Sequence, residues 1–309
     1  MRRENEAIVV VGSLNMDFVV QVGVLPRPGE TVGGWGFRLL PGGKGANQAC
    51  AAARLGGRVA MIGRVGDDVF GGQLLASLDA AGVETDGVLT AAGEPTGVAL
   101  IPVERGGQNQ IVVAPGANHS LRPEEVTAAL DARPARFLLL QLETPPETVA
   151  AAAARAQALG MTVVLDPAPA QALGAELLGS VGLLTPNESE ARVLLGLTPG
   201  GVTLGEAAEV ARRLLALGPR RVVLKLGAQG AWLADRDRSD HFPAPSVEAV
   251  DATAAGDCFN GALAVRLAEG APLDEAVRFA NRAAAISVTR AGAQASLPTR
   301  AEVDTGQNP

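Results

Sequence analysis

Short apolar runs alternate with longer Ala- and Leu-rich amphipathic stretches along most of this 309-residue chain. The apolar runs predict strands at residues 8–11, 59–62, 137–142, 162–165, 182–184 and 222–226. The amphipathic stretches predict helices at residues 46–55, 72–81, 123–131, 147–159, 186–195, 204–217, 256–268 and 273–289. Short buried strands separated by helices predict a mainly parallel central sheet, covered by helices on both faces and joined by right-handed crossovers. The expected fold class is therefore α/β, a three-layer sandwich.

Two segments, residues 16–40 and 96–114, do not follow this alternation, because they hold β-type apolar runs and no helical pattern. A Gly106-Gly107 pair in the second segment is typical of a hairpin turn. We expect the two segments to leave the core and form a small β-sheet lid over the sheet edge. The alternative is that they add antiparallel strands to the main sheet. The α/β domain is expected to span residues 1–300, followed by a frayed C-terminal tail at 301–309.

The composition indicates a packed soluble enzyme, with 47% hydrophobic and 19% charged residues. The net charge of −7 argues against a nucleic-acid surface and against an anionic membrane partner. Two cysteines and two histidines are too few for a disulfide framework or a histidine-based metal cluster. No apolar run approaches the roughly 18 residues that a membrane-spanning helix needs. We therefore expect a cytoplasmic protein.

Polar or flexible residues follow most of the expected strands, namely Asn15 and Asp17, Glu143, Asp166, Asn187 and Gly227. In open α/β sheets, ligands bind beyond the carboxyl ends of the strands. We therefore expect one crevice at this end of the sheet to collect these residues.

A run of small residues, Ala254-Ala255-Gly256, leads into Asp257 at the start of an expected helix. The first turn of a helix carries unpaired N–H groups and the positive end of the helix dipole, which attract anions. The small residues let another group approach these N–H groups. A developing phosphoryl charge could lie there, with Asp257 as the general base for an attacking hydroxyl. The alternative is an ordinary Asp N-cap after a glycine turn.

A second cluster of small residues, Gly42-Gly43-Lys44-Gly45, opens the helix expected at 46–55. Its glycines permit close backbone approach, so Lys44 and the amide of Asn47 could bind ligand hydroxyls or phosphate. The spacing matches neither a Walker A loop nor a G-x-G-x-x-G motif. The alternative is a flexible turn into a helix.

Asn15 and Asp17 place an amide and a carboxylate directly after the first expected strand. This pair suits vicinal hydroxyls, because the acid accepts hydrogen bonds and the amide both donates and accepts them. An Asx-type turn would explain the same two residues.

Residues 185–190 contain a helix start. We expect Thr185 as the N-cap, Pro186 at the first helical position and Glu188 completing a capping box. Asn187 and Glu190 are then left free, and their oxygens could hold a hydrated Mg²⁺. The alternative is a solvated helix face.

Two further loops are rich in glycine or other small residues. The first, residues 224–230, contains Lys225 and could let a nucleotide lie against its backbone, or it could be only a hairpin. The second, residues 290–296, could wrap a monovalent cation with its carbonyl groups, together with those near Asp251 and Thr253.

These motifs resemble those of the PfkB family of carbohydrate kinases, over essentially the whole chain from Gly12 to about Pro298. The most specific matches are residues 12–17, 28–31, 42–49, 166–170, 185–190 and 251–261. The resemblance implies an α/β sandwich whose β-sheet lid is also the interface of a homodimer. It implies transfer of the γ-phosphoryl group of ATP to the 5-hydroxyl of D-ribose, with Mg²⁺ and K⁺ as cofactors.

The resemblance also implies a role for individual residues. Asp257 is the base, and the anion hole is formed by Ala254, Ala255 and Gly256. The sugar contacts, besides the base, are Asn15, Asp17, Gly43, Lys44, Asn47 and Glu143. Glu190 helps to organise Mg²⁺, and the nucleotide contacts are Asn187, Lys225, Gly227, Gly230, Gly256 and Asn281. The K⁺ site is formed by Asp251, Thr253, Ser287, Arg290, Gly292 and Ser296.

Three positions depart from the family pattern: Lys225 and Cys258 stand where Thr is common, and Asn281 stands where His is expected. These departures bear on the nucleotide contacts and leave the reaction type unchanged. Two rival functions stay open. One is a kinase of the same fold that acts on 2-deoxyribose, another sugar or a nucleoside, and the other is a sugar-binding regulator without turnover.

Overall fold

A nine-stranded sheet forms the centre of the molecule in a computed structural model that describes residues 7–306. The strand order is β13-β12-β11-β10-β9-β8-β1-β4-β5. Neighbouring strands are parallel except at the β11–β12 and β12–β13 pairs, which are antiparallel. The strands are β1 (Ala7–Val11), β4 (Arg58–Gly66), β5 (Glu84–Ala91), β8 (Phe137–Leu140), β9 (Thr162–Leu165), β10 (Leu183–Leu184), β11 (Val222–Lys225), β12 (Ala231–Ala234) and β13 (Ser239–Phe242).

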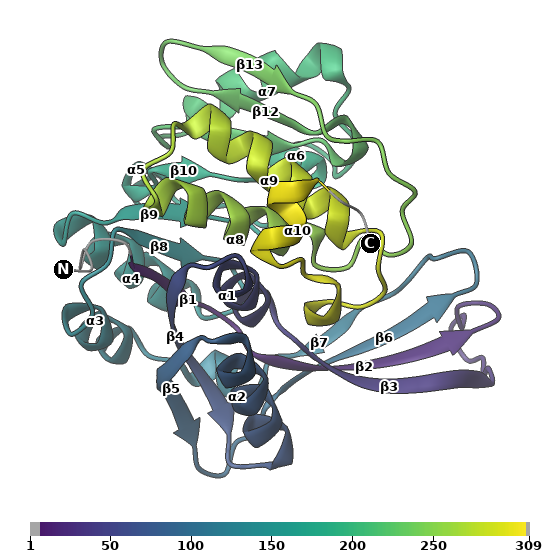
Figure 1. The fold of residues 1–309 in the computed structure, drawn as a ribbon. Helices are drawn as coiled ribbons and strands as arrows, with labels where there is room; N and C mark the ends of the chain where they lie inside the picture. Colours follow the sequence, from purple (N-terminus) through teal and green to yellow (C-terminus); the bar gives the residue numbers. More distant parts are fainter. Residues whose placement is uncertain (1–6, 307–309) are drawn as a thin grey trace.

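Helices cover both faces of this sheet, which confirms the expected three-layer α/β architecture (Figure 1). One face packs against α1 (Lys44–Arg54), α2 (Val69–Ala81), α8 (Ala255–Ala268) and α9 (Leu273–Ser287). The opposite face packs against α3 (Pro123–Asp131), α4 (Pro146–Ala158), α5 (Ala175–Ser180), α6 (Glu188–Leu194) and α7 (Leu204–Leu215).

The pleat of the strands explains why both faces are apolar. Along β1, Ile8 and Val10 belong to the core on one face, and Val9 and Val11 belong to the core on the other. Successive side chains of a strand point to opposite faces, so a strand buried on both faces is a continuous apolar run. This is the pattern that made the central strands recognisable in the sequence.

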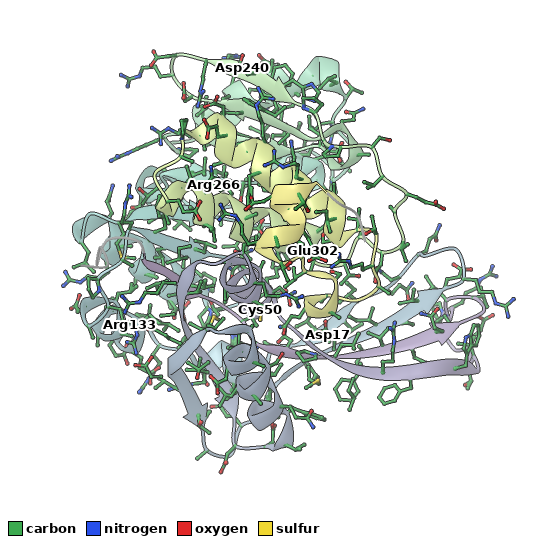
Figure 2. The ribbon with its side chains drawn as sticks, viewed as in Figure 1. Asp17, Cys50, Arg133, Asp240, Arg266 and Glu302 are labelled. Atoms are coloured by element: carbon green, nitrogen blue, oxygen red, sulfur yellow. The ribbon has the colours of Figure 1, made fainter. Side chains whose placement is uncertain are left out.

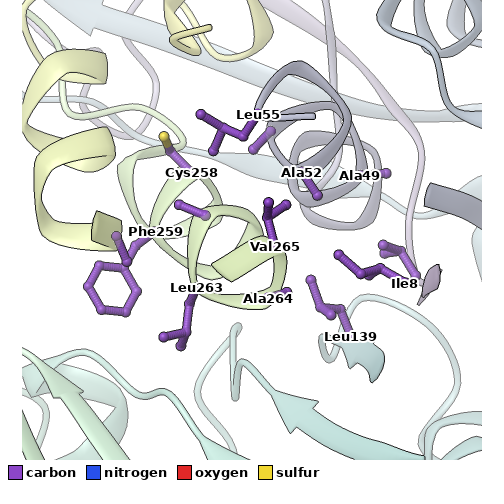
Figure 3. Packing of buried hydrophobic residues seen from close by; sticks show 14 of the residues in the cluster. Ile8, Ala49, Ala52, Leu55, Leu139, Cys258, Phe259, Leu263, Ala264 and Val265 are labelled. Carbon is purple, nitrogen blue, oxygen red and sulfur yellow. The ribbon is translucent and has the colours of Figure 1, made fainter. Parts of the chain in front are cut away.

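Helix α8 lies against α1 within the first of these cores. Figure 3 shows Cys258 and Val265 of α8 on the side that faces Leu55 and Ala52 of α1, whereas Leu263 points away from α1; all of them are buried. Gly261 on α8 lets the two helices approach closely, because a Cβ there would lie 2.7 Å from Ala51 Cβ and 2.8 Å from Ala52 N of α1. This packing brings the N-terminal turns of both helices to the same end of the sheet.

A separate four-stranded sheet is built from the two segments that broke the alternation. Its order is β3-β2-β6-β7, formed by β2 (Asn15–Val22), β3 (Gly34–Gly42), β6 (Gly97–Glu104) and β7 (Val112–Ala114). Figure 1 shows these strands extending away from the α/β body, and Figure 2 places Asp17 near the root of β2. A separate smaller sheet is therefore confirmed, and the alternative of extra strands in the main sheet is wrong.

Several elements were missed or placed differently by the sequence analysis. Strands β5 and β13 and helix α5 were not expected, because their apolar residues are few or lie at a sheet edge. Strand β12 pairs antiparallel with β11, which agrees with the hairpin alternative for residues 224–230. The frayed tail expected after residue 300 is instead a helix, α10 (Arg300–Thr305), in which Val303 is buried and Arg290 contacts Glu302 at 2.6 Å. Residues 1–6 of the expected domain and 307–309 of the expected tail lie outside the described residues. Within the described part of the chain, no helix is long and apolar enough to cross a membrane.

Candidate active site

A cleft of about 780 Å³ opens beyond the carboxyl ends of β9, β10 and β11. Phe259, Ala285 and Val288 from α8 and α9 and Val247 from the loop after β13 form its apolar walls. All residues expected to border a nucleotide line it, namely Asn187, Lys225, Gly227, Gly230, Gly256 and Asn281. The cleft is also lined by Lys44, Asp166, Glu190, Ala254, Ala255 and Asp257. The structure therefore brings the expected nucleotide residues and the expected base into one cavity.

Asp257 lies in the first turn of α8 and is 4% exposed. Its Oδ2 accepts a hydrogen bond from Asn47 Nδ2 at 3.1 Å, and its Oδ1 accepts one from Gln48 Nε2 at 3.0 Å. The helix N-cap is Ala254, and no side chain caps this helix end. The alternative of an Asp N-cap is therefore wrong. The carboxylate accepts hydrogen bonds from α1 and does not cap the start of its own helix.

The anion hole expected from Ala254, Ala255 and Gly256 is only partly free, because Ala255 N donates to Ala252 O at 3.2 Å. Within the described residues, the backbone N–H groups of Gly256 and Asp257 donate to no other group. Ala254 adopts a left-handed conformation (φ 58°), which is uncommon for a residue other than glycine. This conformation precedes the first turn of the helix, and the residues from Ala254 to Asp257 all line the cleft.

The protonation equilibrium of Asp257 is shifted by its surroundings. Burial raises the pKa of Asp257 to about 6, the charge of Lys44 and the amide donors oppose this shift, and Asp166 adds to it. Burial by itself would lower the pKa of Lys44, but the nearby carboxylates of Asp257, Asp166, Glu143 and Glu190 outweigh burial and raise it. Lys44 is therefore a permanent cation beside a carboxylate that titrates close to neutrality.

Gly43 is required by the local geometry at the start of α1. It is the N-cap of the helix with φ 88°, and a Cβ there would lie 2.6 Å from Asn15 N and 2.8 Å from Ser13 O. Only glycine fits such a position, because it tolerates positive φ and has no side chain. The close approach places the start of α1 against the chain segment that carries Asn15 and Asp17.

A polar cluster lies next to Lys44 at the root of the lid. Glu143 Oε2 accepts hydrogen bonds from Ser13 Oγ (2.6 Å), from Lys44 N (3.2 Å) and from Asn15 Nδ2 (3.5 Å). Asn118 Nδ2 donates to Asn15 Oδ1 at 2.8 Å and fixes that amide. These contacts leave Oε1 of Glu143 without a hydrogen-bond partner among the described residues.

Asp17 belongs to the same region and is only 8% exposed. Its side-chain carboxylate has no hydrogen-bond partner among the described residues. Burial, followed by the charges of Glu143 and Asp257, raises the pKa of Asp17 to about 7. A buried acceptor without a protein donor is uncommon in a folded protein. The arrangement is suited to ligand hydroxyl groups that donate to it.

The helix start at residues 185–190 differs from the expectation. Helix α6 begins at Glu188 with Asn187 as its N-cap, so the capping box expected for Thr185 and Glu188 is wrong. Asn187 and Glu190 form the box instead: Glu190 Oε2 accepts from Asn187 N, and Glu190 N donates to Asn187 Oδ1. Both side chains still line the cleft, and burial raises the pKa of Glu190. The side chains of Asn187 and Glu190 are therefore held in place by each other.

The loops expected to hold K⁺ lie side by side. Asp251 Oδ2 accepts a hydrogen bond from Gly292 N at 2.8 Å, and Asp251 Oδ1 accepts one from Thr253 Oγ1 at 2.6 Å. Val250 N donates to Val288 O at 2.7 Å, which joins the loop before α8 to the end of α9. Three of the expected residues have side chains directed elsewhere, to a nearby carbonyl or carboxylate, namely Ser287, Arg290 and Ser296.

Two buried side chains next to the cleft, Gln48 and Gln141, were not expected to belong to the site, and Asp166 was expected in the crevice without a role. Gln48 Nε2 donates to both Asp166 Oδ2 (2.9 Å) and Asp257 Oδ1 (3.0 Å), and Gln141 Nε2 donates to Gln48 Oε1 at 2.8 Å. Asp166 also pairs with Lys225 Nζ at 2.9 Å. Gln48 directly follows the expected sugar contact Asn47 in α1. This position was the sequence signal that could have indicated a role in the site.

Comparison with known proteins identifies the family. The model of the pfkB family of carbohydrate kinases matches residues 5–300. The chain belongs to the PfkB family. A ribokinase of Haemophilus influenzae is 42% identical over 299 residues, covering 96% of this chain and 97% of the relative. A ribokinase of Bacillus subtilis is 43% identical over 298 residues, covering 96% and 98%.

Further relatives of this PfkB kinase carry information on substrates. A deoxyribokinase of Salmonella typhi is 36% identical over 294 residues, covering 94% of this chain and 95% of the relative. The solved structure of Arabidopsis thaliana ribokinase complexed with ribose and ATP is 34% identical, with a TM-score of 0.88 and 98% of each chain covered. The fold and the family resemblance expected from the sequence are both confirmed.

Proposed function

We propose that this PfkB kinase is a ribokinase, which transfers the γ-phosphoryl group of ATP to the 5-hydroxyl of D-ribose. The observation that carries the proposal is the position of Asp257. Its carboxylate is held by Asn47 and Gln48, lines the nucleotide-sized cleft, and is near enough to Asp17 for the two charges to interact. The similarity to ribokinases, one of which is bound to ribose and ATP, supports the same assignment.

In the proposed mechanism, Asp257 accepts the proton of the sugar 5-hydroxyl as that oxygen attacks the γ-phosphorus. Phosphoryl transfer mainly requires alignment and charge stabilisation. The free N–H groups of Gly256 and Asp257, with the dipole of α8, stabilise the charge that develops on the transferred group. Lys44 contributes a permanent positive charge from the facing helix start.

The sugar is proposed to bind between the root of the lid and α1. Asp17 accepts hydrogen bonds from ribose hydroxyls, and so does the free oxygen of Glu143. Asn15 is oriented for the same hydroxyls by Asn118. Gly43 and Asn47 form the α1 side of the site. Gly43 has no side chain to obstruct the sugar, and Asn47 donates a hydrogen bond to Asp257.

The residues fit an oxygen-liganded Mg²⁺ that is bound mainly by the nucleotide. Within the described residues, no group of three or more His, Cys, Asp or Glu side chains forms a metal cluster. Glu190 is the proposed contact, through water, because its carboxylate lines the cleft and is held by Asn187. When bound, Mg²⁺ supplies charge neutralisation at the phosphate oxygens.

K⁺ is proposed to bind between the loops that hold Asp251 and Gly292, just before the anion hole. Carbonyl groups are the donors that such a cation needs, and the two loops are tied together by backbone and carboxylate hydrogen bonds. The role proposed for the cation is to fix the loop that positions the first turn of α8. Activity measured in KCl and in N-methylglucamine chloride at equal ionic strength tests this assignment.

The lid is proposed to be the interface of a homodimer. Leu39, Leu100 and Val112 lie in register with Phe18 across the four strands, and Phe37 on β3 is 60% exposed. Exposed apolar patches of this kind mark association sites. A cytoplasmic location remains a prediction from the sequence.

A substrate panel tests the proposed function. We expect ATP-dependent product formation with D-ribose, and a lower kcat/KM with 2-deoxyribose, fructose and ribonucleosides. A site built to bond a hydroxyl discriminates strongly against a substrate that lacks it. A higher kcat/KM for 2-deoxyribose would favour the deoxyribokinase alternative, for which the 36% identical relative is the supporting observation. Sugar binding without ADP release would instead indicate a regulator.

A further inference from the structure

A continuous chain of polar contacts joins the nucleotide side of the cleft to Asp257. Lys225 Nζ on β11 lies 2.9 Å from Asp166 Oδ1, directly after β9. Asp166 Oδ2 accepts a hydrogen bond from Gln48 Nε2, and the same nitrogen donates to Asp257 Oδ1. Four different elements therefore contribute to one path along the cleft, in which Lys225, Asp166 and Asp257 line the cleft and Gln48 lies behind them. The Lys225 end of this path also lies close to the anion hole, since a Cβ at Gly256 would lie 3.3 Å from Lys225 Nζ.

Gln48 is the central member of this path, and its orientation is determined by its partners. A carboxylate can only accept hydrogen bonds, so the two N–H hydrogens of Gln48 face the two carboxylates. The remaining oxygen accepts from Gln141 Nε2 at 2.8 Å. Gln48 is 1% exposed, and every polar atom of its side chain is satisfied. The amide is therefore locked, with no rotation that keeps all three contacts.

Asp166 and Asp257 both lie in a region of low dielectric, where two carboxylates sharing one neighbour repel each other. Each is at most 4% exposed. The amide of Gln48 separates them with a donor for each. Lys44 from α1 and Lys225 from β11 supply the positive charge, and Asp17 from β2 adds a further negative charge facing Asp257. Without the amide, ionised Asp257 loses a hydrogen-bond donor, and its repulsion from ionised Asp166 is no longer offset.

We propose that Gln48 is a positioning residue for phosphoryl transfer, which keeps Asp257 ionised and aligned by bridging it to the Lys225–Asp166 pair. This inference rests on the proposed function, in which Asp257 is the base. It assigns Gln48 no contact with either substrate. Loss of the amide therefore lowers kcat more than it changes either KM, because the interaction acts on the base itself.

The first test is direct and needs no turnover. The ionisation of Asp257 is followed by NMR in protein labelled with ¹³C at the aspartate carboxyl carbon, with Asp257→Asn to assign the signal. In Gln48→Met we expect the Asp257 transition to move about one pH unit upward, as removal of a donor to a charged group predicts. The matched control is Gln141→Met, which deletes the contact behind Gln48 and leaves both carboxylates with their donor. An unchanged transition in Gln48→Met, or an equal shift in the control, overturns the proposal.

The second test uses kinetics with whichever sugar the wild-type enzyme phosphorylates. For Gln48→Met we expect kcat at pH 8, where Asp257 is still mostly ionised, to fall about tenfold or more through lost alignment of the base, and each KM to stay within about threefold. The acid limb of the kcat profile should move upward. A change confined to KM contradicts the proposal. If wild-type protein phosphorylates no sugar, the proposed function fails, and the NMR titration still decides the role of Gln48.

A second substitution covers the case in which Gln48→Met does not fold. Gln48→Glu keeps the size of the side chain, but its ionised form donates to neither carboxylate. We expect its kcat at pH 8 to fall at least as far as expected for Gln48→Met. Retention of kcat within about threefold of wild type, with each variant judged at saturating substrate, would show that the donor is not needed.

Discussion

The ammonium group of Lys225 lies 2.9 Å from Oδ1 of Asp166 in a nearly buried ion pair, with side-chain exposures of 12% and 4%. Charges removed from water are costly unless they are paired, so each of these residues depends on the other. The pair lies on the wall of the cleft and beside Gly256. Lys225 is thus held by the protein at the place where nucleotide phosphates are proposed to arrive.

Lys225→Met should weaken ATP binding and destabilise the fold, because it leaves Asp166 buried without its partner. We expect the free energy of unfolding to fall by about 3 kcal/mol, near the lower end for a broken buried pair. The double variant Lys225→Met/Asp166→Asn should recover much of this loss but not the ATP affinity. Denaturant unfolding and KM for ATP measure the two effects. Arg236→Met, at an exposed position, is the control.

Asp257→Asn should lower kcat by about 10²–10⁴, the usual contribution of a general base. The fold should be retained, because Asn is similar in shape and the surrounding helices are unchanged. Steady-state kinetics with ribose and ATP measure the loss, and circular dichroism checks the fold. A kcat within about tenfold of wild type would show that Asp257 is not the base.

The activity of the wild-type enzyme should fall as the pH drops through about 6. Burial raises the pKa of Asp257 from 3.8 to about 6, and only the ionised form accepts the proton. The kcat profile should therefore show an acid limb near that pH, measured at saturating ribose and ATP. An acid limb below pH 5 would contradict an ionisation controlled by this buried carboxyl.

The same shift affects stability with a defined sign. A folded-state pKa above the unfolded value means that ionised Asp257 destabilises the fold, so its contribution is most favourable below about pH 4 and is lost as the pH rises through 6. Asp257→Asn should therefore have a higher Tm than wild type at pH 8. Thermal unfolding across pH 4–8 should show this difference shrinking as the pH is lowered.

Ribose binding should strengthen as the pH rises through about 7. Burial raises the pKa of Asp17 to about 7, and the ionised carboxylate is the better acceptor for sugar hydroxyls. KM for ribose should fall across this range, while KM for ATP should follow no such transition. Asp17→Asn should raise KM for ribose and remove its pH dependence.

Phe37→Glu should convert the proposed dimer into a monomer, because it places a charge on the exposed apolar surface of the lid. Light scattering coupled to size exclusion measures the mass of each variant. Leu204→Glu is the control, since Leu204 is also exposed but lies at the start of α7. A wild-type protein that is monomeric at micromolar concentration would contradict the dimer.

Much of the architecture could be read from periodicity. The buried central strands are continuous apolar runs, and α3 occupies the residues expected for it, Pro123–Asp131. Edge strands such as β13 carry few apolar residues, as in Ser239–Phe242, so they lack that signal. The start of α6 was misplaced because Thr185 and Asn187 are both good N-caps. Thr185 instead donates its N–H to Leu165 O of β9, and Asn187 caps the helix.

The amino-acid sequence by itself determined the fold class and most of the residue types of the site, because strand and helix periods and small-residue helix starts are local properties. The partners of those residues were decided only by the tertiary structure. Gln48 reaches Asp166 and Asp257, which lie 118 and 209 residues away along the chain. Contacts of that separation depend on how α1, α8 and the end of β9 pack together, and no local pattern records them.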